Sequence, residues 1–242
     1  RACPGWPSRA SSSATSEPVG RPSPTVSNVT LSLLHQRVLS WYAQESRSLP
    51  WREPGTSPWG VLVSEVMLQQ TPVQRVEPVW RAWMSRWPAP AALAASATGE
   101  AIRAWGRLGY PRRALHLHAA AVAMVEQHRG EVPHTHDELL ALPGVGAYTA
   151  AAVSAFAFGQ RTTVIDTNVR RVLARVINGA GQAGPPISRA EKDLATALLP
   201  HEPELRRLWN AAARELGALC GWARHPRCLD GPASGRFAAR PG

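Results

Sequence analysis

The stretch LPGVGAYTAAA, residues 142–152, decides the fold of this 242-residue chain. It places two glycines around one valine, directly after a proline, and follows them with small residues that favour helix. Upstream, Thr135 and Glu138 have the spacing of a capping box, in which each side chain bonds a backbone N–H of the other residue. The segment therefore predicts two helices, over 135–141 and 147–158, joined by a tight turn.

Two glycines in one turn suggest a role beyond reversing the chain. Glycines at 144 and 146 are expected to adopt positive φ and to leave no side chain over the turn, so that a phosphate can approach the N–H groups at the start of the next helix. A plain helical hairpin, whose glycines only satisfy turn geometry, would have the same pattern. We interpret Gly144, Val145 and Gly146 as contacts to a DNA backbone.

The charge of the chain supports a polyanionic partner. Lysine and arginine number 27 against 17 acidic residues, a formal net charge of +10. Lys192 is the only lysine, so nearly all of this charge is arginine. Arginine suits bidentate phosphate binding, although genomic base composition could produce the same bias.

The rest of the chain also has helical spacing, from about residue 29 onward. Val73, Val76, Trp80, Trp83 and Trp87 recur at steps of three and four, which places them on one helix face. No segment alternates with a period of two, so the fold class is all-α. Helices are expected over 29–46, 60–70, 73–87, 89–96, 99–106, 112–128, 135–141, 147–158, 167–178, 189–199 and 203–219, with a second capping box at Ser188 and Glu191.

Composition marks the remaining segments. Residues 1–28 are rich in Ser, Pro and Gly, lack the apolar core of a signal peptide and are expected to form a disordered tail. NGAGQAGPP, residues 178–186, is expected to connect two lobes. No run of 18 apolar residues occurs, so no membrane span is expected. The three cysteines, Cys3, Cys220 and Cys228, are too few for a disulfide framework and indicate a reduced, cytoplasmic setting.

Two carboxylates stand out from this helical background. Asp166, in VIDTNVRRV, suits a helix N-cap, where it should stay ionised, although a purely structural cap would look the same. Glu65, in VLVSEVMLQQT, lies among apolar residues that would favour its protonated form, unless it occupies the solvent face of that helix. An acid that keeps its proton and a base that stays charged are what cleavage of a glycosidic bond requires.

Five motifs together resemble a known family. The chain is similar to the adenine DNA glycosylases of the MutY type, which belong to the helix-hairpin-helix, Gly/Pro-rich, Asp superfamily, over roughly residues 29–230. The most specific element is SEVMLQQT. The motifs are LPWR (49–52), SEVMLQQT (64–71), LGY (108–110), LPGVGAYTA (142–150) and VIDTNVRRV (164–172).

The resemblance implies two helical lobes with the active-site cleft between them. One lobe is expected to combine residues 29–55 with 162–242. The other, residues 56–161, is expected to be a six-helix barrel that carries the helix-hairpin-helix at 135–158.

The resemblance also implies roles for individual residues. Glu65 matches the acid that protonates a ring nitrogen of adenine, and Asp166 the carboxylate that stabilises or captures the sugar cation. Tyr148 and Asn168 match residues that orient these groups and the attacking water. Trp51 and Arg52 correspond to the pocket for the extruded base. Gln70 and Tyr110 correspond to side chains that push into the duplex, and Arg170 is expected among the DNA contacts.

The expected function is hydrolysis of the N-glycosidic bond of adenine mispaired with 8-oxoguanine or guanine in double-stranded DNA, by a cytoplasmic, nucleoid-associated monomer. The bifunctional relatives carry a lysine where this chain has Tyr148, and Lys192 lies outside every motif, so a water-using, monofunctional enzyme is expected. Two alternatives remain open: a thymine or uracil mismatch glycosylase, which is not expected to carry Glu65, and a non-catalytic DNA-binding remnant.

The end of the sequence departs from the family pattern. Relatives usually hold a [4Fe–4S] cluster with four cysteines, but alignment on Cys228 places Gly221, Gly231 and Phe237 at the other three positions, and Cys220 falls one residue from the first. No cofactor is therefore expected. Relatives also generally append a module that reads 8-oxoguanine, and because this sequence ends at Gly242 the preference for the opposite base stays open.

Overall fold

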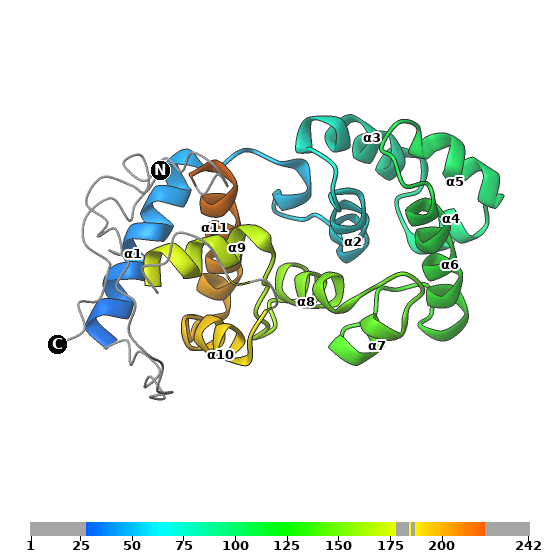
Figure 1. The fold of residues 1–242 in the computed structure, drawn as a ribbon. Coiled ribbons are helices and arrows are strands. Elements are labelled where there is room, and N and C mark those ends of the chain that lie inside the picture. Colours follow the sequence, from blue (N-terminus) through cyan, green and yellow to red (C-terminus); the bar gives the residue numbers. More distant parts are fainter. Residues whose placement is uncertain (1–27, 178–183, 185–186, 221–242) are drawn as a thin grey trace, which may run out of the picture. The chain divides into compact units, whose positions relative to one another are not determined.

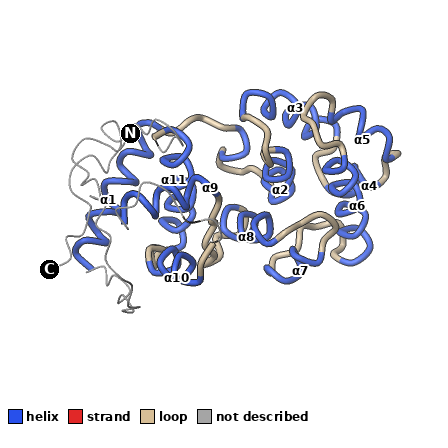
Figure 2. Tube along the Cα trace, in the orientation of Figure 1, coloured by secondary structure: helices blue, strands red, loops and turns tan. Residues whose placement is uncertain are grey.

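The computed structural model describes residues 28–177, 184 and 187–220, and within these residues all regular structure is helical (Figures 1 and 2). The all-α fold predicted from the sequence is confirmed. The elements are α1 (Asn28–Glu45), η1 (Pro50–Arg52), α2 (Pro58–Met67), α3 (Val73–Arg86), α4 (Pro90–Ala94), α5 (Thr98–Trp105), α6 (Arg112–Gln127), α7 (His136–Ala141), α8 (Ala147–Phe156), α9 (Thr167–Val172), η2 (Leu173–Ile177), α10 (Arg189–Ala197) and α11 (Pro203–Leu219).

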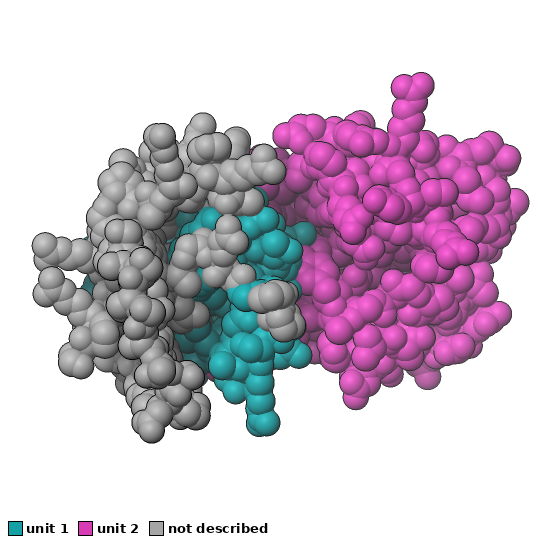
Figure 3. All heavy atoms as spheres, viewed as in Figure 1, with its two compact units in different colours: residues 1–46, 165–242 teal, residues 47–164 magenta. Residues whose placement is uncertain are grey.

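The chain divides into two compact units, shown in different colours in Figure 3. One unit is the continuous segment 47–164, and the other combines residues up to 46 with those from 165 onward. The first division falls earlier than the expected break after residue 55, because Trp51 packs edge-on against Trp80 at 5.8 Å between ring centroids. The segment LPWR thus belongs to the 47–164 unit, which contains seven α-helices, the five-residue α4 included.

Tryptophan side chains organise the core of the 47–164 unit. The stripe predicted on α3 is buried at Val76, Trp80, Trp83 and Trp87. Trp83 contacts the rings of Trp87 and Trp105 edge-on, at 4.8 and 5.5 Å, and such pairs each add about 1 kcal/mol beyond burial. The indole of Trp80 donates to the carbonyl of Gly60 at 2.9 Å, which fixes α3 against α2.

In the other unit, helices α1, α9, α10 and α11 share a second core. On α1, His35 contacts the ring of Trp209 at 4.7 Å and lies 2.7 Å from the carbonyl of Leu198. Gly217 of α11 lies directly against α9, because a Cβ there would be 2.3 Å from the carbonyl oxygen of Asn168. This close approach positions the start of α9, where Asp166 and Asn168 lie.

Both predicted capping boxes are present, at Thr135 with Glu138 and at Ser188 with Glu191. Two helices end clearly earlier than predicted. The helix expected over 60–70 ends at Met67, and the helix expected over 167–178 is α-helical only to Val172 and continues as the π-helix η2. No helix of the described residues is long and apolar enough to cross a membrane. Three expectations concern residues outside the described part: the tail before residue 28, most of the connection at 178–186, and the cluster positions from 221 onward.

Candidate active site

The stretch 142–152 forms the turn and second helix of the helix-hairpin-helix that the sequence predicts. Helix α7 ends at Ala141, α8 begins at Ala147, and the two follow one another across a short loop in Figure 1. The N–H of Val145 donates to the carbonyl of Leu142 at 3.1 Å, and Gly144 has φ +75°. A proline at the second position of a four-residue turn and a glycine with positive φ at the third are typical of a type II turn.

The two glycines of this turn differ from the expectation that both need positive φ. Only Gly144 does; Gly146, the N-cap of α8, has φ −89°. A Cβ on Gly144 would lie 2.3 Å from the Cβ of His116 on α6, whereas a Cβ on Gly146 would meet nothing within 4 Å. Gly144 therefore lets the turn pack on α6, and Gly146 leaves open space at the start of α8.

Val145 also differs from its expected role as a DNA contact. Its side chain is 7% exposed and belongs to the core of the 47–164 unit, and its N–H is already used within the turn. Among the described residues at this tip, the amides of Gly144 and Gly146 have no backbone acceptor, and neither has that of Ala147 at the start of α8. An incoming phosphate would meet these two glycines, with Val145 as the anchor beneath them.

Glu65 lies on α2, a helix in which every residue from Trp59 to Met67 is buried. Its side chain is 3% exposed, which excludes the solvent-facing alternative left open by the sequence. The hydroxyl of Tyr148, in the first turn of α8, donates to Glu65 Oε2 at 3.3 Å. Gln69 and Thr149 add a second bond between the same two segments, at 3.3 Å. The hairpin and the buried carboxylate are thus held together by side chains on both.

Asp166 caps α9, as predicted. Its Oδ1 accepts the N–H of Val169 at 2.8 Å, and its Oδ2 accepts the side-chain amide of Asn168 at 3.1 Å. Arg214 Nε lies 3.8 Å from Oδ2, and Arg171 donates to the Asn168 Oδ1 at 3.1 Å. The Asp166 side chain keeps 20% of its surface exposed while these donors face it.

The four expected catalytic residues therefore form two pairs. Glu65 with Tyr148 lies in the 47–164 unit, and Asp166 with Asn168 lies in the other unit. In each pair, a carboxylate is held by a neutral side chain that donates a hydrogen bond to it.

The other expected site residues fall into two groups. Trp51 is 6% exposed and packs in the core, and Arg52 beside it is half-buried at the end of η1. Gln70 and Tyr110 are exposed, Tyr110 to 62%, and both have positive φ, at 56° and 49°. These two exposed side chains are available to a partner molecule.

Arg170 differs from its expected place among the DNA contacts. Its guanidinium donates to both carboxylate oxygens of Glu191, at 3.1 and 3.2 Å, and to the carbonyl of Gly184 at 2.6 Å. Only 17% of the Arg170 side chain is exposed. The arginine therefore joins α9 to the start of α10.

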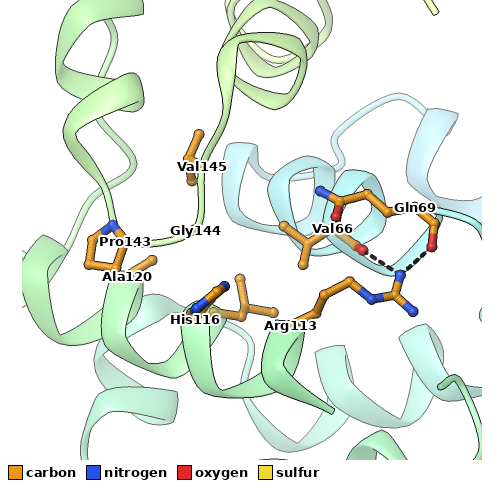
Figure 4. A pocket seen from close by; sticks show the side chains of 9 residues that line it. Val66, Gln69, Arg113, His116, Ala120, Pro143, Gly144 and Val145 are labelled. Carbon is orange, nitrogen blue, oxygen red and sulfur yellow. Dashed lines mark hydrogen bonds between the residues drawn. The ribbon is translucent and has the colours of Figure 1, made fainter. Parts of the chain in front are cut away.

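Sequence reasoning missed Arg113. This residue lies on the buried stripe of α6 with Leu117, Ala120 and Met124 and is 9% exposed. Its side chain lines a small pocket beneath the hairpin, with Val66 and Gln69 on one side and His116 and Gly144 on the other (Figure 4). The available signal was a charged residue at an apolar position of a helical repeat.

The described residues offer no metal site. No group of three or more His, Cys, Asp or Glu side chains gathers anywhere in residues 28–177 or 187–220. Cys220, the one described cysteine, is half-buried at the end of α11. The donor set for a [4Fe–4S] cluster is therefore not met by this part of the chain, and the positions from 221 onward supply Cys228 alone.

Comparisons with known proteins identify the family. Residues 63–198 match the model of the HhH-GPD superfamily base excision DNA repair proteins. The chain is 51% identical over 198 residues to an adenine DNA glycosylase of Mycolicibacterium smegmatis, and this alignment covers 82% of this chain and 67% of that protein. It is 32% identical over 194 residues to a thymine/uracil-DNA glycosylase of Pyrobaculum aerophilum, covering 79% of this chain and 84% of that one.

A solved structure gives the same result for the fold. A thermostable thymine-DNA glycosylase superposes with a TM-score of 0.77 at 25% identity, covering 86% of this chain and 94% of that one. The chain spans about two thirds of the length of the mycobacterial relatives it matches. By its sequence, helical fold and hairpin, the chain belongs to the HhH-GPD superfamily of base excision DNA repair proteins, among the adenine DNA glycosylases.

Proposed function

We propose that this chain hydrolyses the N-glycosidic bond of adenine mispaired with 8-oxoguanine or guanine in double-stranded DNA, and that it does so without strand cleavage. The observation that carries the proposal is the hydrogen bond from Tyr148 to the buried Glu65. This bond joins Glu65, the proposed general acid, to the first turn of α8 through the Tyr148 hydroxyl. A strand-cleaving relative would carry a lysine amine at the position of Tyr148. The 51% identity to an adenine DNA glycosylase supports adenine as the base.

The proposed chemistry assigns one task to each carboxylate. Glu65, whose Oε2 accepts from Tyr148, acts as the general acid and gives a proton to a ring nitrogen of the extruded adenine. The C–N bond then breaks, and its electron pair leaves with the neutral base. The sugar is left as an oxocarbenium-like cation, which the Asp166 carboxylate stabilises until a water molecule adds to the sugar carbon and releases a proton to the solvent.

The test is base excision under single-turnover conditions from a duplex with one A·8-oxoguanine pair, followed by alkaline cleavage. Wild type should release adenine, and Glu65→Gln should lose about 10²–10⁴-fold in rate because the acid is gone. Glu126→Gln, at an exposed position of α6, is the matched control and should behave as wild type. Intact duplex from wild type would exclude the proposal, as would borohydride trapping of a protein–DNA adduct.

A thymine or uracil mismatch glycosylase is the second candidate. The fold match to a thymine-DNA glycosylase and the 32% identity to a thymine/uracil enzyme favour it. Placing thymine or uracil opposite guanine in the same duplex separates the two candidates. Release of thymine or uracil faster than adenine would establish the second.

We also propose that the enzyme works as a monomer and holds no iron–sulfur cluster. Three of the four family ligand positions, Gly221, Gly231 and Phe237, have no sulfur, and one thiolate does not hold a cubane. The purified, active protein should show no absorbance band near 400 nm and no bound iron (about 400 nm is where thiolate-bound iron–sulfur clusters absorb). Stoichiometric iron would contradict this part of the proposal.

A further inference from the structure

Gln70 and Tyr110 share an unusual backbone conformation. Their φ angles are 56° and 49°, in the left-handed region that side chains other than glycine rarely adopt. Such residues cost about 1–3 kcal/mol each and persist only where the surrounding structure holds them. Both side chains are exposed, so their own packing does not hold them there.

One buried side chain contacts both segments. The Nη1 of Arg113 donates to the carbonyls of Val66 and Met67, both at 3.1 Å, and to that of Gln69. Two of these three bonds are drawn in Figure 4. This half of the guanidinium therefore holds the segment that leads from the end of α2 into Gln70.

The other half of the same guanidinium holds the second segment. Its Nη2 donates to Thr71 Oγ1 at 3.1 Å and to the carbonyls of Leu108 and Gly109 at 3.3 and 3.0 Å. The Thr71 hydroxyl in turn donates to the carbonyl of Leu108 at 3.1 Å, which joins the two segments directly. The acceptors thus flank Gln70 on both sides and lead into Tyr110.

The charge of Arg113 is compensated by backbone oxygens. No carboxylate is among its acceptors in the described residues; the positive charge instead faces the last carbonyls of α2, the negative end of that helix. Burial lowers the pKa of Arg113, while the nearby phenol of Tyr110 raises it. The guanidinium carbon lies 5.4 Å from the Tyr110 ring centroid. A planar fork with several donors suits this set of acceptors, and a lysine ammonium does not.

We propose that Arg113 is a positioning residue that holds Gln70 and Tyr110 at one fixed spacing, so that both side chains enter the duplex together when a base is extruded. This inference rests on the proposed function, because it takes double-stranded DNA as the partner. Without the six hydrogen bonds of Arg113, residues 70 and 110 would relax toward negative φ and their side chains would turn away from this shared arrangement.

A double-mutant cycle on the full chain tests the proposal through single-turnover excision of adenine. Arg113→Met should slow excision about 10–100-fold, because a small misplacement of a positioning group costs this much. In a Gln70→Ala/Tyr110→Ala background the same substitution should change the rate less than about threefold, since the groups it positions are absent. An equal loss in both backgrounds would overturn the proposal.

The matched control is Arg112→Met, which removes the same charge from the neighbouring, exposed position and should leave the rate unchanged. Arg113→Lys keeps the charge but not the fork, and should resemble Arg113→Met. If Arg113→Met does not fold, Thr71→Val carries the cycle, because it removes the hydroxyl bridge between the two segments while keeping the side-chain shape. Thr71→Val should then slow excision in the wild-type background only.

A second readout separates this inference from the proposed function. A 2-aminopurine placed beside the mispair becomes fluorescent when it loses its stacking neighbours. Wild type should raise this fluorescence and Arg113→Met should not, whether or not a base is released. A protein that excises adenine with the same fluorescence response in wild type and Arg113→Met would overturn the inference alone. One that unstacks DNA through Arg113 but releases no base would remove only the proposed function.

Discussion

Gly144 and Gly146 lie two positions apart and are glycine for different reasons. At Gly144 the backbone has φ +75° and the Cβ position is occupied by His116, so both conformation and space exclude a side chain. At Gly146 the backbone is extended and the Cβ position is open. The first glycine therefore serves the fold, and the second is free to serve a ligand.

Alanine at these two positions should separate stability from DNA binding. Gly144→Ala should lower the free energy of unfolding by about 1–3 kcal/mol, through left-handed strain and overpacking against α6. Gly146→Ala should leave that free energy within about 0.5 kcal/mol of wild type while weakening duplex binding, because its methyl group occupies the approach to the amides. Urea unfolding and binding titrations at fixed salt give the two numbers. Equal binding by Gly146→Ala and wild type would show that no phosphate approaches there.

Tyr148 should act on the chemical step through Glu65. Tyr148→Phe keeps the ring and removes only the hydroxyl that donates to Oε2. The single-turnover excision rate should fall about tenfold, the equivalent of one hydrogen bond to a charged or polarised group, with unchanged duplex affinity. Tyr42→Phe, on the half-buried face of α1, is the control. An unchanged rate in Tyr148→Phe would mean that the hydroxyl does not help to position the acid.

At the scale of elements, α10 is fixed at its start by a charged capping box. Burial alone would raise the pKa of Glu191, but the hydrogen bonds from Arg170 and Ser188 outweigh burial and lower it. A carboxyl whose pKa is lower in the folded state than in the unfolded chain stabilises the fold. For Glu191 this stabilisation is complete when the pH lies above the ordinary pKa of about 4.5. The stabilisation is lost as the pH falls through the lower pKa that Glu191 has in the folded state.

Glu191→Gln should show this dependence. At pH 7 it should lower the free energy of unfolding by about 1–2 kcal/mol, because a partly buried arginine loses its partner. The difference from wild type should begin to shrink below about pH 4.5, where the unfolded chain takes up a proton, and should disappear once the pH falls below the lower pKa of the folded state. Urea unfolding from pH 7 to pH 3 measures it. Glu138 belongs to the exposed capping box with Thr135, whose hydrogen bonds lower the pKa of Glu138. Glu138→Gln should therefore change the free energy of unfolding less than Glu191→Gln does. A difference that does not vary with pH would contradict the account.

Elements were predictable wherever local chemistry decides them. The capping boxes at Thr135 and Ser188 and the apolar stripe of α3 follow from spacing along one helix, and the structure confirms them. The sequence left the burial of Glu65 open, and the structure shows this side chain to be buried. It also confirms the predicted cap at Asp166, whose catalytic role stays a prediction. The contacts of Arg113 could not be predicted, because three of its acceptors are the backbone carbonyls of Val66, Met67 and Gln69, which lie 47, 46 and 44 residues away along the chain and belong to no side-chain pattern.

At the scale of the whole molecule, the 47–164 unit should fold without the rest of the chain. Every buried residue of its main core lies between Leu49 and Val153. The isolated segment should show helical circular dichroism and cooperative unfolding, and should bind DNA in a salt-dependent way through the hairpin. It should release no base, because Asp166 lies outside it. Excision by this segment would show that the second carboxylate is dispensable.

The insertion of the 47–164 unit into the other unit has a consequence for synthesis on the ribosome. Helix α1 emerges early, but Trp209 of α11, which shares its core, follows about 170 positions after Leu34 and Val38. At typical translation rates this is a wait of roughly 8–30 s, during which Leu34 and Val38 have no native cover. The apolar face of α1 therefore stays open to solvent while the 47–164 unit is synthesised, and it can be buried only after α11 has left the ribosome.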